Sequence, residues 1–461
     1  MLTAELTRFR RELGVLTGLA APLAVAQLAQ MAMGVIDTVM AGRLSSVDLA
    51  GVALGGTLLW PTIMLMMGTL QAVTPSVSQL NGGGRQAEIG EIIRQAFYLA
   101  LVAAVIIVTV IQFARPYFEL VGIEPAAVDV AVGYLEAQQW GAPAAMGYFV
   151  LRYMAEGMGQ TRVALYIVTG ALIMKVPLNL AFMHGYYGLP AMGGAGTGAA
   201  TAVVLWYQLA AIGFIVTRSR FASARLTERF SPPDPRVLKA LLAIGIPIGI
   251  TLFFEVTMFS FTTLLVGRYG SEVVAAHVIA MNLGGVAFMV PMAFGMAGTI
   301  RVGFNVGAGE FARARLTAIA ELCCAFGLAC IIAVLIVIFR EDIAGIYTRE
   351  PEVIALATTL MFFVLGFQFF DGLQSIAIAT LRGYKDTKVA MYATMFGYWG
   401  VGVPVACILG WGLVGEPMDV YGFWIGLTVG LGVVAALMTT RLLRISGRVA
   451  RQGMPEIATA N

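Results

Sequence analysis

The chain has 461 residues, of which 59% are hydrophobic and only 12% are charged. Ordinary soluble domains have about 25% charged residues, so this composition excludes a soluble globular protein and indicates a polytopic membrane protein. The net charge is only +3, which gives no reason to expect a nucleic-acid partner.

Apolar segments, taken in chain order, predict an all-α membrane protein with twelve transmembrane helices. A helix needs about 20 apolar residues to cross the hydrocarbon core, and tilted helices are longer. The first apolar segment is too long for the apolar region of a signal peptide, so we expect no cleavable signal. The expected spans are 14–40, 49–80, 92–113, 130–151, 163–184, 194–217, 238–266, 274–306, 317–339, 353–381, 389–412 and 421–443.

The basic residues of the connecting segments predict the orientation in the membrane. If the N-terminus lies in the cytoplasm, 22 of the 29 Lys and Arg residues fall in cytoplasmic segments and five fall on the opposite side. Short loops that are rich in Lys and Arg remain in the cytoplasm. We therefore expect both termini of the chain to be cytoplasmic.

The two halves of the chain repeat each other, which is clearest for their prolines. Pro22, Pro61 and Pro177 correspond in order to Pro247, Pro291 and Pro404. Each of these prolines removes a backbone hydrogen bond and permits a bend in a span. The bends are either fixed packing kinks or bends that change during transport.

The repeat predicts two pseudo-symmetric lobes of six helices. Because six is an even number, both halves enter the membrane in the same sense and are related by an axis along the membrane normal. We expect a first lobe at 1–217 and a second lobe at 238–445. A basic cytoplasmic linker with three prolines joins them at 218–237, and 446–461 forms a cytoplasmic tail.

Few ionisable residues are expected in the membrane interior. They are Asp37, Lys175, Glu255 and Asp371, with Arg301 near the end of its span. A charged group in the bilayer costs at least a few kcal/mol unless it is paired, so such residues mark transport or proton-relay sites. The acids outnumber the one deeply placed lysine. A cleft lined in this way favours cations, whether Na⁺, H⁺ or an organic cation.

Glu255 and Asp371 both belong to the second half, and each lies about midway along its span. Both could face one cavity. Neighbouring carboxylates repel each other, so one of the pair is expected to bind a proton or a cation at neutral pH. The alternative is two unrelated acids, each satisfied by a nearby hydroxyl or backbone group.

Asp37 is the acid of the first half, and Asn179 and Thr201 could join it. Carboxylate, amide and hydroxyl oxygens are ligands that hard cations prefer. The alternative is hydrogen bonding between helices, which Asn and Thr commonly provide in membranes. At ~1.5 Å per residue, Lys175 lies more than two turns from the depth of Asp37, so we expect no direct pair between them.

Sequence motifs of enzymes are missing. The chain has no phosphate-binding loop, no nucleophile elbow and no HExxH motif. Its four cysteines lack the spacing of metal ligands and lie in apolar segments. We therefore expect neither an enzyme nor a bound cofactor.

Four motifs identify a resemblance that covers essentially the whole chain. They are PLN at 177–179, GGAGTGAATA at 193–202, AAHVIAMNL at 275–283 and RVGFNVGAG at 301–309. Together with two halves of six spans, they resemble the multidrug and toxic compound extrusion (MATE) transporters. The presence of Glu255 and Asp371 in addition to Asp37 resembles the NorM-type bacterial branch.

The resemblance implies a monomeric antiporter of the bacterial inner membrane with alternating access between its lobes. Na⁺ and/or H⁺ would enter while a cationic, amphipathic drug leaves. It implies that Glu255 and Asp371 take part in cation binding, and that Asp37, Asn179 and Thr201 form a further cation site. Met183 stands where some relatives have a second acid, so protonation of Asp37 is an alternative to Na⁺ binding.

Other classes of membrane protein predict different residues. A facilitator-type transporter would have a charged Gly-Asp-Arg-type motif after its second span, where this chain has GRQAE at 84–88. A lipid-linked flippase would have a cavity lined mainly by basic residues. A receptor or scaffold needs no buried acids.

Overall fold

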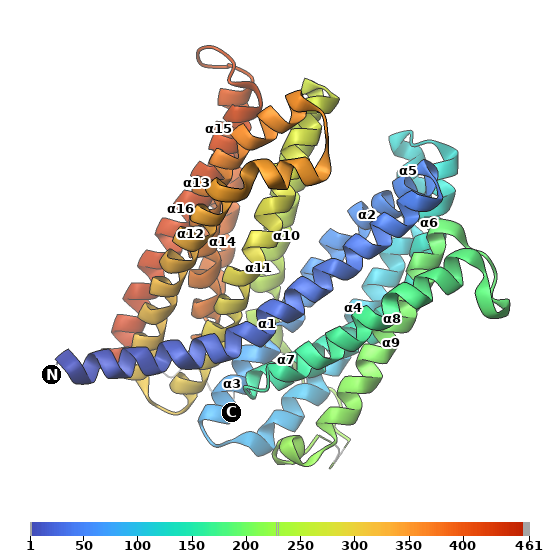
Figure 1. Cartoon of the computed structure of the whole chain (residues 1–461). Helices are drawn as coiled ribbons and strands as arrows, with labels where there is room; N and C mark the ends of the chain where they lie inside the picture. The colour runs from blue at the N-terminus through green and yellow to red at the C-terminus, as the bar shows by residue number, and fades with distance from the viewer. Residues whose placement is uncertain (1, 227, 229, 455–461) are drawn as a thin grey trace. The chain divides into compact units, whose positions relative to one another are not determined.

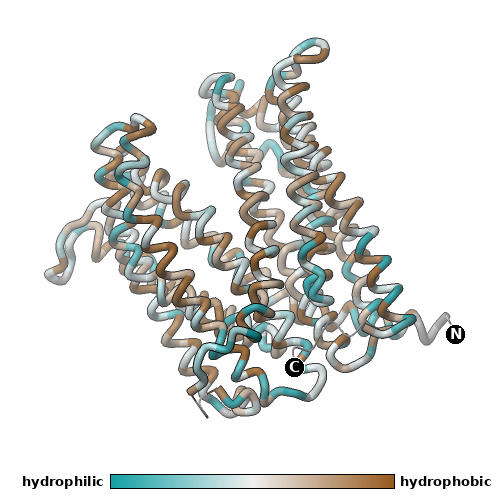
Figure 2. Tube along the Cα trace, turned by 180° about the vertical axis from the view of Figure 1, so that it is seen from behind, coloured by the Kyte–Doolittle hydropathy of each residue, from teal (hydrophilic) through white to brown (hydrophobic). Residues whose placement is uncertain are grey.

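The computed structural model describes residues 2–454 except 227 and 229, and this part of the chain contains helices and no strand (Figure 1). The long helices are apolar along most of their length (Figure 2). The α-helices are α1 (Leu2–Leu44), α2 (Ser46–Leu70), α3 (Val73–Gly82), α4 (Ile89–Gln112), α5 (Ala114–Val121), α6 (Pro125–Gln138), α7 (Ala142–Gly157), α8 (Arg162–His184), α9 (Gly196–Val216), α10 (Pro235–Val266), α11 (Ser271–Gly307), α12 (Phe311–Tyr347), α13 (Pro351–Gly383), α14 (Lys388–Thr394), α15 (Val403–Gly410) and α16 (Asp419–Gln452).

Eleven helical segments in the described residues are long and apolar enough to cross a membrane, so the chain is a multi-pass membrane protein. The remaining expected span, 130–151, falls on α6 and α7. Neither of these helices reaches the length of about 20 residues that a span needs. The short 3₁₀ turn Gln139–Gly141 separates them, and Pro143 lies in the first turn of α7. The expected span 130–151 is therefore a broken helix.

The chain forms two compact units. The first, here called the N-unit, is Val25–Gly249, and the second, the C-unit, holds the described residues of Met1–Ala24 and Ile250–Thr459. Two helices cross the boundaries that the sequence predicts for the lobes. The start of α1 belongs to the C-unit, and the start of α10 belongs to the N-unit.

Side-chain packing explains why α1 and α10 change units. Leu16 and Ala20 of α1 belong to one buried cluster with residues of α11 and α12. Gly245 of α10 lies directly against α2, where an added Cβ would be 2.0 Å from the carbonyl oxygen of Thr69. Each helix changes unit two residues after its matched proline, Pro22 or Pro247. The repeat identifies equivalent segments of sequence, but not the helices they pack against.

The N-unit places the end of α1 near α8 and α9. Met33 of α1 is buried in one cluster with Val168 of α8 and Val204 of α9. The start of α9 is fixed by Asp48, whose carboxylate accepts a hydrogen bond of 2.7 Å from the backbone N–H of Gly194. Gly198 allows α9 to approach α6, because a Cβ there would lie 2.3 Å from the carbonyl oxygen of Tyr134. The glycine-rich motif at 193–202 therefore sets the position of Thr201.

The C-unit packs α13 against α11, α12 and α16. Its buried residues include many alanines, which let helices approach closely, as is common in membranes. The middle of α12 carries exposed Ile331, Val334 and Ile338 instead. Large exposed apolar side chains on a spanning helix are suited to contact with lipid.

Candidate functional site

The first polar cluster lies within the N-unit and joins α1, α8 and α9. We call it the Asp37 cluster: Asp37, Lys175, Asn179 and Thr201. The Asn179 amide nitrogen donates to Asp37 Oδ1 over 2.8 Å, and the Thr201 hydroxyl lies 3.4 Å from Asp37 Oδ2. Lys175 Nζ lies 2.9 Å from the same Oδ2 atom and also donates to the Thr201 hydroxyl. Asp37, Lys175 and Asn179 are all buried.

The pair between Lys175 and Asp37 overturns the expectation that these residues do not meet. The positions of Lys175 and Asp37 along ideal, straight spans predict different depths in the membrane. However, Lys175 is four residues before Asn179 and so lies on the same face of α8. The long lysine side chain then covers the remaining distance of about one turn, 5.4 Å. The i, i+4 spacing was the signal in the sequence that could have predicted this pair.

The ammonium group of Lys175 decides the chemistry of the Asp37 cluster. Asp37 Oδ2 and the Thr201 hydroxyl, which would be ligands for a metal cation, both contact Lys175 Nζ. A buried carboxylate next to a buried ammonium forms a neutral pair, and separating them is costly. A cation would have to displace Lys175 to reach Asp37 Oδ2. The buried Asn179 Oδ1 has no hydrogen-bond partner among the described residues.

The second polar cluster lies within the C-unit and joins α10, α13 and a π-helical segment, η7 (Met395–Gly402). We call it the Glu255–Asp371 cluster, and it also contains Gln374 and Tyr398. The amide nitrogen of Gln374 is 3.1 Å from Asp371 Oδ1 and 3.5 Å from Glu255 Oε1. The Tyr398 hydroxyl donates to Gln374 Oε1 over 2.7 Å. One glutamine side chain therefore connects both acids.

The π-helical segment η7 brings two aromatic residues to this cluster. Its glycines and the following Pro404, which lacks a backbone N–H, weaken the regular hydrogen-bond pattern. Tyr398 points to Gln374, while Trp399 packs against Phe254 and Phe261 at ring-centroid distances of 6.5 and 5.5 Å. Phe254 directly precedes Glu255 in α10, so these aromatic residues belong to the same stretch of helix as the acid.

The two acids of this cluster differ from Asp37 in their counter-charge. Within the described part of the chain, no Lys, Arg or His forms an ion pair within 4.0 Å of a carboxylate oxygen of Glu255 or Asp371, although the charge of Arg382 acts on Glu255 from a greater distance. Asp371 is 3% exposed, and both acids lie along apolar helices. Two carboxylates that share one donor at such a site repel each other unless a proton or another cation neutralises them.

The structure therefore brings together Asp37, Asn179 and Thr201 in one unit and Glu255 and Asp371 in the other. The sequence reasoning missed Gln374 and Tyr398 as members of the second cluster. Gln374 could have been found, because it follows Asp371 by three residues and so lies on the same face of α13. Tyr398 could not, because its position depends on the π-helical segment.

Two further buried networks were also missed. Glu12 of α1 is 2% exposed and binds Arg301 through two bonds of 2.8 Å, and Arg313 over 2.6 Å. Within the N-unit, Arg152 and Glu156 of α7 form a buried pair at 2.7 Å, and Arg152 also donates to Gln27 Oε1 of α1 over 2.8 Å. These networks fix helices to each other, because every charge in them has a partner.

Comparisons with known proteins match the fold and both halves of the chain. The MatE family model matches residues 22–181 and 247–408. Multidrug resistance protein PmpM of Pseudomonas aeruginosa is 42% identical over 450 residues, which cover 96% of this chain and 94% of that protein. Multidrug resistance protein MdtK of Yersinia enterocolitica is 41% identical over 430 residues, 93% of this chain and 94% of that protein.

Solved structures agree with the fold. The eukaryotic MATE transporter AtDTX14 aligns with a TM-score of 0.86 at 20% identity, over 97% of this chain and 100% of that chain. The Vibrio cholerae MATE transporter VcmN in its bent form aligns with a TM-score of 0.84 at 17% identity, over 96% and 99%. The all-α membrane fold and the family predicted from the sequence are confirmed. With a family model that covers both halves and relatives above 40% identity over nearly the whole length, the chain belongs to the MatE family.

Proposed function

We propose that this protein is a multidrug exporter that exchanges a cationic, amphipathic drug for Na⁺ or H⁺ across the bacterial inner membrane. The names of its relatives, multidrug resistance proteins, support drug export. The ion coupling rests on the two acidic clusters. Export works by alternating access between the two halves of a monomer, with both termini in the cytoplasm.

The observation that carries this proposal is the Glu255–Asp371 cluster. Its two carboxylates share the Gln374 amide and have no ion-pair partner in the part of the chain that the structure describes. A site with unneutralised acids in the membrane binds a cation and releases it when the environment changes. Ion binding drives transport only if the ion has a higher affinity for one conformation than for the other. We assign this role to Glu255 and Asp371.

The Asp37 cluster has a different role in the proposal. Lys175 already supplies a positive charge at the oxygen atoms that a Na⁺ ion would use. A proton can neutralise Asp37 without needing the space of a metal ion, and it would release Lys175 from the pair. We therefore assign proton binding, rather than Na⁺ binding, to Asp37, with Asn179 and Thr201 orienting the carboxylate.

The aromatic residues next to Glu255 support a cationic, amphipathic drug. Trp399 packs against Phe254, which directly precedes Glu255, and its indole N–H donates to the Phe254 carbonyl oxygen over 3.4 Å. Aromatic faces attract organic cations and bury their apolar parts, and a desolvated cation–π contact contributes about 2 kcal/mol. A carboxylate adds attraction for the positive charge without demanding one particular shape.

Uptake of ethidium into everted membrane vesicles, which corresponds to export from the cell, tests the role of the two acids. Glu255→Gln and Asp371→Asn keep the side-chain shapes but remove the charges, and we expect each to abolish ion-driven transport. Glu321→Gln is the matched control, because Glu321 is a fully buried acid of the same unit that lies outside the cluster. Undiminished coupled transport in both cluster variants would refute the assignment.

A further inference from the structure

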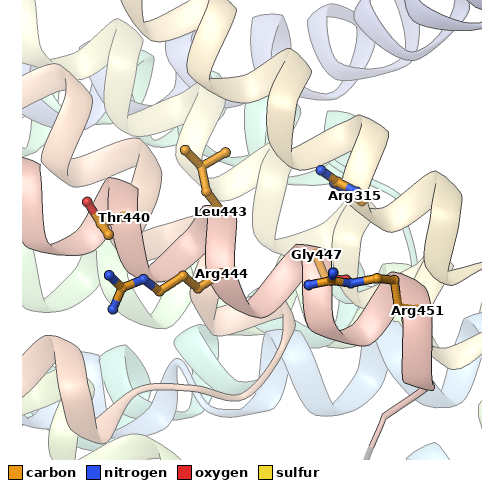
Figure 3. A pocket seen from close by; sticks show the side chains of 6 residues that line it. All are labelled: Arg315, Thr440, Leu443, Arg444, Gly447 and Arg451. Carbon is orange, nitrogen blue, oxygen red and sulfur yellow. The ribbon is translucent and has the colours of Figure 1, made fainter.

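A cavity at one end of the C-unit lies between the start of α12 and the end of α16. Its volume is about 410 Å³, and it is lined by Arg315, Thr440, Leu443, Arg444, Gly447 and Arg451. Figure 3 shows Arg315 coming from α12 and the other five residues coming from α16. Three of the six lining side chains are therefore guanidinium groups.

Two of these arginines meet at Gly447. A Cβ added to Gly447 would lie 4.0 Å from the Cζ atom of Arg315, so the missing side chain leaves room for that guanidinium. Arg451 Nε donates to the Gly447 carbonyl oxygen over 3.2 Å. The start of α12 lies beside the end of α16 here, since an added Cβ at Gly453 would lie 3.5 Å from the ring of Phe311. The glycine thus brings charges from α12 and α16 together.

The arginines of this cavity lack the carboxylate partners that their neighbours have. Arg313 pairs with Glu12 and Glu310, and Arg441 pairs with Asp386. In the described residues, no carboxylate lies within 4.0 Å of Arg315, Arg444 or Arg451. Burial raises the pKa of Tyr384, and the charge of Arg315 opposes that rise. Tyr384 is therefore a neutral phenol near Arg315 and supplies no counter-charge.

We propose that this cavity binds the phosphate of an anionic phospholipid headgroup from the cytoplasmic leaflet. Guanidinium groups bind phosphate oxygens in a forked geometry, and three of them around one cavity would bind it from several directions. The N-terminal end of α12 adds a partial positive charge.

The surroundings of the cavity favour a lipid as the source of the phosphate. Arg315 is near the start of one apolar span, and Arg444 and Arg451 are near the end of another. Leu443, which lines the cavity, is 46% exposed. With both termini in the cytoplasm, as proposed above, this end of both helices lies at the cytoplasmic surface, where basic cavities between membrane helices bind anionic headgroups. An acyl chain could then follow the apolar surface of α12.

Native mass spectrometry of the full-length chain in detergent tests the proposal, with cardiolipin, phosphatidylethanolamine and inorganic pyrophosphate as separate probes. We expect cardiolipin to bind at least about tenfold more tightly than the other two. The variant Arg315→Gln/Arg451→Gln should lose about tenfold or more in cardiolipin affinity, because both forked contacts are removed. The matched control is Arg448→Gln, which removes an exposed charge from the same end of α16 but outside the cavity, and it should change the affinity by about twofold or less.

Gly447→Leu provides a second test that keeps every charge. The added leucine side chain would occupy the space that the Arg315 guanidinium now uses. Cardiolipin binding should therefore weaken in this variant as well. Equal losses in Arg448→Gln and in the double variant would overturn the proposal, because they would show diffuse attraction without a site. Unchanged binding in Gly447→Leu would overturn it too. If pyrophosphate binds as tightly as cardiolipin, the ligand is a soluble phosphate and the lipid assignment is wrong.

Discussion

Replacing Glu12 by Gln tests whether the start of α1 is fixed to the C-unit by its buried ion network. The Glu12 carboxylate accepts two bonds of 2.8 Å from Arg301, one of 2.6 Å from Arg313 and one of 3.1 Å from the Thr317 hydroxyl. The Arg301 side chain is only 11% exposed. The substitution therefore leaves a mostly buried guanidinium without a negative partner.

The size of the effect follows from this geometry. Removing one partner of a buried ion pair costs about 3–5 kcal/mol of unfolding free energy. Gln keeps one acceptor oxygen, and Arg313 can turn to solvent, so we expect a value near the lower limit, about 3 kcal/mol. Glu310→Gln is the matched control: Glu310 pairs with the same Arg313 at 2.9 Å but its side chain is 49% exposed. An exposed pair contributes about 0–1 kcal/mol.

Denaturant unfolding of the purified protein in detergent, followed by tryptophan fluorescence, measures both variants. The double variant Glu12→Gln/Arg301→Gln should recover part of the loss, because it removes the unpaired buried charge together with its partner. If Glu12→Gln costs no more than Glu310→Gln, the network does not hold α1 and our account of this segment is wrong.

Three further substitutions test other contacts. Lys175→Met leaves Asp37 buried without its cation and should lower the free energy of unfolding by about 3 kcal/mol in the same assay. Adding Asp37→Asn should restore most of this loss. A single variant as stable as the unmodified protein would contradict the ion pair. Tyr398→Phe removes the 2.7 Å bond to Gln374 and should cost about 1 kcal/mol and slow ethidium efflux, and unchanged efflux would show that Gln374 needs no support. Gly198→Ala should cost about 1–3 kcal/mol because its Cβ would meet Tyr134, whereas Gly213→Ala, in open space on the same helix, should not destabilise the protein.

The fold was largely predictable because the lipid environment permits few backbone structures. Backbone groups in the hydrocarbon core must be bonded within the segment, so long apolar segments become helices. The break between α6 and α7 escaped notice because apolar residues continue on both sides of Gln139–Gly141. The start of α1 packs in the C-unit and the start of α10 packs in the N-unit. This arrangement was not predictable, because sequence repeats do not reveal which helices pack together.

The candidate site was predictable in its acids but not in their partners. An acid near the middle of an apolar span is easily recognised, and Asp37, Glu255 and Asp371 were predicted on this basis. Glu321, which is buried near the start of α12, was not predicted. The partners of the three predicted acids depend on helix rotation and side-chain reach, and the depth of Lys175 along its span does not reveal its contact with Asp37. Glu12 lies before the first expected span, where an acid is ordinarily solvated, so nothing in the sequence indicated that it is buried.

Ethidium efflux from proteoliposomes under two imposed gradients tests the central claim of coupled exchange most directly. One set of vesicles has a Na⁺ gradient at equal pH, and the other has a pH gradient without Na⁺. For the unmodified protein, we predict that at least one gradient drives efflux. We predict that neither drives it in Glu255→Gln/Asp371→Asn, while Glu321→Gln retains it. Equal ethidium movement with and without both gradients would contradict ion-coupled antiport.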